Sequence, residues 1–112
     1  MEMIFGYSRK QAIEDGVLVD VSEMAREAGF TFPVAITEKV WHEYIVNEEE
    51  GQSTEGRLWD TLWMLRMAIR KGGGSTITYS VLYGDKIVKL KAVCGPGDDL
   101  EPVITIMLPD ED

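Results

Sequence analysis

One stretch of the sequence constrains the fold more than any other. Residues 57–71, RLWDTLWMLRMAIRK, form the longest run of good helix formers in the 112-residue chain, with no Gly or Pro inside it. At about 100° per residue, one apolar stripe falls within roughly 60° of arc, and its members are Leu58, Leu62, Leu65 and Ile69. A second stripe lies beside it and consists of Trp59, Trp63 and Met67. The rest of the chain is therefore expected to cover this helix.

Three short helices are predicted before this one, from capping residues and stop glycines. They cover residues 8–15, 22–28 and 37–46. Gly16 and Gly29 follow the first two and suit the left-handed conformation that ends many helices.

Two extended segments and one loop connect these helices. Residues 17–21 and 30–36 are rich in apolar and β-branched side chains. Pro33 has no backbone N–H to donate to a neighbouring strand, so residues 30–36 are expected to be extended but not to form a central strand. Residues 47–56, NEEEGQSTEG, have the composition of a solvated loop.

The last third of the sequence changes its hydrophobic period from 3.6 to 2. Strands are predicted over residues 76–83, 86–94 and 102–108, and Gly84-Asp85 forms a hairpin turn between the first two. The sequence therefore predicts an α+β fold, with short N-terminal helices and one long central helix packed on a three-stranded antiparallel β-meander. Residues 1–112 are expected to form a single domain.

The charge is unevenly distributed. The net charge of −9 disfavours non-specific binding to DNA or to anionic membranes. Residues 1–56 hold 4 basic and 12 acidic side chains, residues 57–91 hold 7 basic and 2 acidic, and residues 92–112 hold 6 acidic and no basic ones. The acidic ends could neutralise the basic middle within the fold, or they could present carboxylates to a basic partner.

The residue types that carry chemistry are sparse. His42 is the single histidine and Cys94 the single cysteine, and neither stands in a catalytic, metal-binding or redox motif. Residues 95–99, GPGDD, lack the ligand spacing of a calcium loop. No catalytic, cofactor-binding or metal-binding residues are predicted, and the sequence favours a protein that is not an enzyme. The absence of a leader and of a long apolar run predicts a cytoplasmic protein without a membrane partner.

One surface has a composition that suits binding. On the helical wheel of residues 57–71, basic residues alternate with aromatic ones, as in binders of single-stranded nucleic acid. Lysines of the second predicted strand could extend this surface, although alternation places them on the sheet face that turns away from the helix. The candidate interaction surface comprises Trp59, Trp63, Arg66, Met67, Arg70, Lys89 and Lys91. Alternatively, the indoles belong to the core and the arginine stems cover them.

The N-terminal half resembles a known family. The resemblance lies in residues 7–21, YSRKQAIEDGVLVDV, in the strings AREAGF and FPVAIT, and in the closing GPGD and PVITIMLP. These strings are similar to a family of small bacterial proteins, a domain of unknown function often found on mobile elements and phages. The resemblance implies an accessory protein of such elements and implies no catalytic residues.

Three functions follow from these observations. The first is a non-enzymatic protein-interaction factor of a mobile element or phage, with an unknown protein partner. The second is an RNA-binding, single-stranded nucleic-acid-binding or small ribonuclease-like domain that uses the basic and aromatic surface. The third is a structural homodimer that pairs through the Trp59, Trp63 and Met67 stripe.

Overall fold

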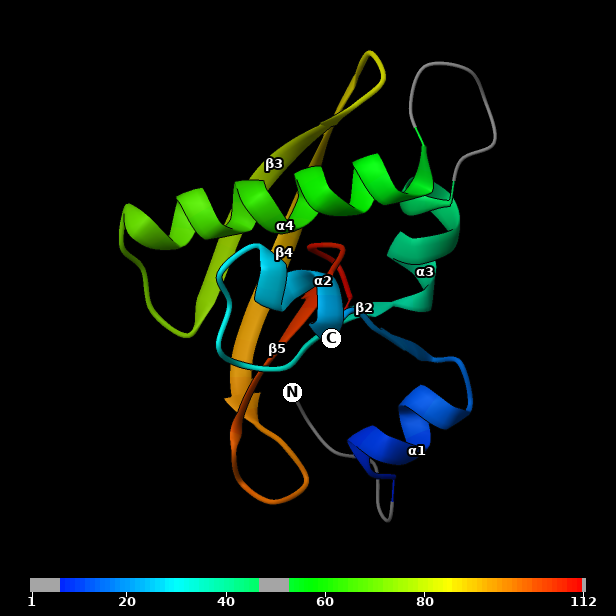
Figure 1. Ribbon diagram of the computed structural model, residues 1–112, viewed down its shortest axis with the longest axis vertical. Helices are drawn as coiled ribbons and strands as arrows, with labels where there is room; N and C mark the ends of the chain where they lie inside the picture. The colour runs from blue at the N-terminus through cyan, green and yellow to red at the C-terminus, as the bar shows by residue number, and fades with distance from the viewer. Residues whose placement is uncertain (1–6, 47–52, 112) are drawn as a thin grey trace.

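The long predicted helix is α4, which spans Thr54–Arg70 and crosses one face of a five-stranded sheet (Figure 1). This computed structural model describes residues 7–46 and 53–111, so most of the predicted loop at 47–56 lies outside the described residues. Ser53 is the N-cap of α4, because its Oγ accepts a hydrogen bond from the Gly56 N–H at 3.0 Å, so the helix begins inside the predicted loop. Gly72, with φ of 100°, follows its last turn.

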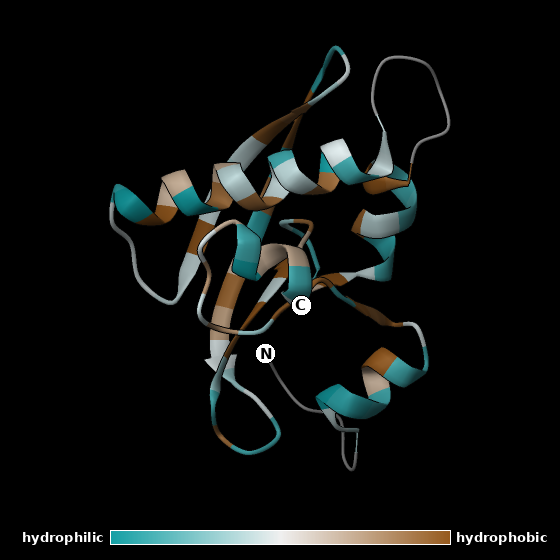
Figure 2. Ribbon diagram, in the orientation of Figure 1, coloured by the Kyte–Doolittle hydropathy of each residue, from teal (hydrophilic) through white to brown (hydrophobic). Residues whose placement is uncertain are grey.

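The inner stripe of α4 is largely as predicted. Leu58, Leu62 and Leu65 are buried in the main core. Figure 2 shows hydrophilic and hydrophobic residues alternating along α4, as this one-sided burial requires. Ile69 departs from the prediction, since it is 40% exposed. It lies in the last turn, where a groove separates the helix from the strands.

The predicted three-stranded antiparallel meander is wrong as an account of the sheet. The three expected strands, β3 (Thr76–Tyr83), β4 (Lys86–Pro96) and β5 (Pro102–Met107), are present and pair antiparallel. Two more strands, β1 (Leu18–Asp20) and β2 (Val34–Thr37), join beyond β5. The order is β1-β2-β5-β4-β3, and β2 pairs parallel with β5, so the sheet is mixed.

Strand β2 also contradicts the expectation that this segment is not central. It is flanked on both sides, and Val34, Ala35 and Ile36 have no exposed surface. Pro33 is compatible with this position because it precedes the strand, where its missing N–H is not needed. Its carbonyl oxygen still accepts a hydrogen bond from the Ile104 N–H at 2.9 Å.

Helices cover both faces of the sheet. On the α4 face lie α2 (Ser22–Glu27), α3 (Glu38–Val40) and a π-helical turn at Trp41–Ile45, and they share the main core. The opposite face carries α1 (Arg9–Glu14), which packs through Ala12 on Leu18 and Ala35.

Helix α1 is attached to the C-terminal third by polar contacts. The Arg9 guanidinium donates to Thr105 Oγ1 at 2.8 Å and to the Ile104 carbonyl oxygen at 2.9 Å. In the opposite direction, the Asp98 carboxylate accepts from the backbone N–H groups of Arg9 and Lys10 at 2.8 and 3.0 Å. These two N–H donors hold the pKa of Asp98 below its usual value. The turn after β4 therefore fixes the start of α1.

This contact predicts acid sensitivity. Because the pKa of Asp98 is lower in the folded state, its carboxylate stabilises the fold above the unfolded-state pKa of about 3.9. This stability is lost as the pH falls through the folded-state pKa. Urea unfolding from neutral to acidic pH should show a smaller acid-induced loss for Asp98→Asn than for the wild type. Asp99→Asn, one residue along the same turn, is the control and should retain the wild-type profile.

Candidate functional site

The outer face of α4 carries two exposed tryptophans. Trp59 and Trp63 are 36% and 42% exposed, and their rings stack with centroids 6.0 Å apart and planes inclined by 11°. The i, i+4 spacing places the two side chains one above the other on the helix. Their neighbour Met64 is 43% exposed, and Met67 is half-buried. The indoles are therefore surface groups and not the core groups of the alternative interpretation.

Arg66 has a structural role in addition to its place beside the indoles. Its Nη1 donates to the carbonyl oxygen of Ala28, the C-cap residue of α2, at 2.9 Å. Gly29 follows with φ of 101°, and a Cβ at this position would lie 1.4 Å from Arg66 Nη1. The guanidinium is thus held against the end of α2. Arg70, one turn further along α4, is exposed.

The two lysines lie on the other side of the sheet. Val88, Leu90 and Ala92 of β4 face the main core below α4, so Lys89 and Lys91 point to the opposite face. Lys89 is exposed, and the Lys91 Nζ donates to the Glu111 carbonyl oxygen at 2.7 Å.

The structure thus divides the seven predicted residues. Trp59, Trp63, Met67 and Arg70 share the outer face of α4, Arg66 borders it, and the lysines are separated from it by the sheet. Sequence reasoning missed Met64. Its wheel position, about 100° from Trp63, could have placed it at the border of this face. We call Trp59, Trp63, Met64 and Met67 the outer apolar face of α4.

A buried polar cluster lies below the start of α4. The Tyr79 hydroxyl donates to the Thr61 carbonyl oxygen at 3.1 Å, and the hydroxyls of Tyr83 and Thr61 hydrogen-bond to each other. The Arg57 guanidinium lies 5.5 Å from the Tyr83 ring centroid and donates to the Tyr44 carbonyl oxygen at 2.8 Å. Burial raises the pKa of Tyr83 to about 12, and it also raises that of Tyr79. Both phenols are neutral hydrogen-bonding groups that join the helix to β3.

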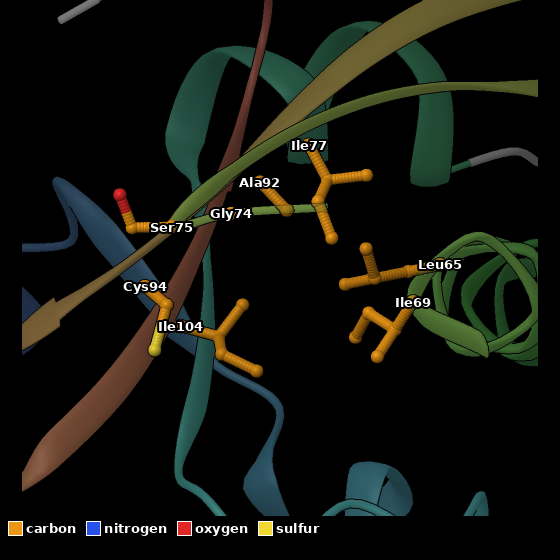
Figure 3. A pocket seen from close by; sticks show the side chains of 8 residues that line it. All are labelled: Leu65, Ile69, Gly74, Ser75, Ile77, Ala92, Cys94 and Ile104. Carbon is orange, nitrogen blue, oxygen red and sulfur yellow. The ribbon is translucent and has the colours of Figure 1, made fainter. Parts of the chain in front are cut away.

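A shallow apolar groove lies at the other end of α4 (Figure 3). Its volume is about 220 Å³ including open solvent. Figure 3 shows Leu65 and Ile69 on the helix facing Cys94 and Ile104 on the strands. The remaining lining residues are Gly74, Ser75, Ile77 and Ala92. Cys94 is a partly buried free thiol within β4, which continues past the predicted strand end to Pro96.

His42 lies on the exposed side of the π-helical turn, and the structure does not assign it a role. Over residues 7–46 and 53–111, no three His, Cys, Asp or Glu side chains come together in a way that could hold a metal ion. Within the same ranges, no helix is both long enough and apolar enough to cross a bilayer.

Comparison with known proteins places the chain in a family. Neither the curated proteins nor the solved structures contain a match. A model for a family of unknown function, DUF6573, matches residues 1–72, which include β1, β2 and the helices α1 to α4. The match ends before the closing strings GPGD and PVITIMLP. Since it covers more than half of the sequence, the chain belongs to DUF6573, a family whose function is unknown.

Proposed function

We propose that this protein is a non-enzymatic interaction module that binds another protein through the outer apolar face of α4. The observation that supports this is the exposed, stacked pair of Trp59 and Trp63. Tryptophan is enriched among the few interface residues that supply most of the binding free energy. Because the two rings already stack in the unbound protein, they lose little rotational freedom on binding.

The neighbouring side chains favour a protein partner over a nucleic acid. Met64 and Met67 continue the apolar surface beside the indoles, and methionine adapts its shape to different partners. Arg66 is engaged by Ala28, and the sheet separates Lys89 and Lys91 from the rings. This leaves few cations for the phosphates that would flank stacked bases.

The biological setting is part of the same proposal. The resemblance to proteins of mobile elements and phages supports an accessory factor that acts in the cytoplasm of a bacterial host.

The test is affinity capture from nuclease-treated lysate of cells that carry a gene of this family. We expect the double variant Trp59→Ala, Trp63→Ala to capture at least about tenfold less partner than the wild type. The control is Leu82→Ala, Ile87→Ala, which removes two exposed apolar side chains that pair across the β3–β4 hairpin on the opposite face. Equal capture by both variants, or recovery of nucleic acid alone from untreated lysate, would refute the proposal.

A further inference from the structure

Charged residues are arranged in a definite order around the outer apolar face of α4. At about 100° per residue, Trp63 and Met67 lie at the centre of this face. Asp60 and Lys71 lie on one side of these two residues, between Met67 and Met64 on the helical wheel, and are about three turns apart along the helix. Trp59 and Arg70 lie on the other side, again about three turns apart. Lys71 and Arg70 are exposed, and Asp60 is partly exposed.

This order makes the face complementary to itself. A twofold axis perpendicular to α4, midway between Trp63 and Met67, relates positions whose residue numbers sum to about 130. The rotation keeps each side of the face on its own side and reverses the helix direction. Asp60 then faces Lys71 of the second copy, and Trp59 faces Arg70 of the second copy. At the centre, Trp63 faces Met67.

We propose that a second copy of this chain binds the outer apolar face of α4, so that two α4 helices pair antiparallel. The inference rests on the proposed function and specifies its partner. Each ion pair and each contact between an arginine and an indole occurs twice, because the interface is isologous. In a parallel pair, by contrast, the twofold axis runs along the helices and exchanges the two sides of the face, so Lys71 would face Arg70 of the second copy and the like charges would repel. The charges therefore select the antiparallel arrangement.

The length of the contact sets its strength. Residues 59–71 span about 18 Å at 1.5 Å per residue, or between three and four helical turns. This is a single helix pair and not an extensive interface, so the dimer should dissociate on dilution. Sedimentation velocity over about 1 µM to 1 mM should show a reversible change from monomer to dimer.

Charge exchange tests the arrangement. Asp60→Lys or Lys71→Asp alone places like charges opposite each other at two symmetric positions, and each should raise the dimer Kd about tenfold. The double variant restores opposite charges and should return the Kd to within about threefold of wild type. The controls Asp85→Lys and Lys86→Asp make the same charge changes at the exposed tip of the β3–β4 hairpin. They should leave the Kd within about twofold.

Two results would overturn the inference. One is a monomer at all concentrations, and the other is a dimer whose Kd does not recover in the double variant. The capture experiment separates this failure from failure of the proposed function. If the protein is monomeric and the tryptophan variant still loses its captured partner, the interaction module stands and its partner is a different protein. If the tryptophan variant captures as much as the wild type, both proposals fail.

Discussion

Leu62→Ala is expected to lower the free energy of unfolding by about 2–5 kcal/mol. Leu62 has no exposed surface and lies at the centre of the α4 stripe, between Leu58 and Leu65. Strands β4 and β5, which share this core, are held by ladders on both sides, so the cavity left by the truncation can collapse only in part. Urea unfolding followed by far-UV circular dichroism measures the change.

Ile69→Ala is the matched control, because it removes a similar side chain from the same stripe. Ile69 is 40% exposed at the border of the groove, and its truncation should cost less than half as much as that of Leu62. Equal losses for the two variants would contradict the packing described for the last turn of α4.

Alkaline pH is expected to destabilise the fold as the pH rises from about 10 to 12. Burial raises the pKa of Tyr83 to about 12 and also raises that of Tyr79, whereas the unfolded chain has ordinary tyrosines with a pKa of about 10. The unfolded state therefore loses protons first, and the stability present below pH 10 is lost progressively above it. Each tyrosine contributes a slope of up to about 1.4 kcal/mol per pH unit.

Tyr83→Phe separates this effect from the titration of lysines. The variant should unfold with a shallower dependence on pH above 10, because one of the two buried phenols is gone. It should also lose about 1 kcal/mol at neutral pH, since the Thr61 hydroxyl keeps its bond to the Arg57 carbonyl oxygen but loses its bond to the Tyr83 hydroxyl. The near-ultraviolet absorbance of tyrosinate measures ionisation directly. Titration of all tyrosines near pH 10 in the folded protein would refute the explanation.

Local signals in the sequence predicted the elements that are defined locally. The stripe of leucines predicted α4 and Gly84-Asp85 predicted the hairpin, although the first turn of α4 lies in the segment predicted as a loop. The sheet was underestimated because β1 and β2 have only three and four residues and pair with distant partners. Val34 pairs with Ile104, and no local pattern in the sequence specifies a parallel contact of this kind.

The candidate surface shows the same limit. The helical period correctly placed Trp59 beside Trp63, because neighbours on a helix depend only on spacing. The alternation of β4 also placed Lys89 and Lys91 on the face away from α4, where they lie. Neither pattern could reveal that the Arg66 guanidinium donates to the carbonyl oxygen of Ala28, 38 residues earlier in the sequence. Such a contact depends on how α2 and α4 pack.

The position of β5 in the sheet has a consequence for synthesis on the ribosome. β5 lies between β2 and β4, so it joins a pair of strands made early to a pair made late. Until residue 107 has left the exit tunnel, β2 and β4 each have an unpaired edge, and the buried side chains of β2 lack their neighbours. A nascent chain that pauses after α4 would expose the unpaired edge of β2 to other chains, and that edge is where chaperones would bind.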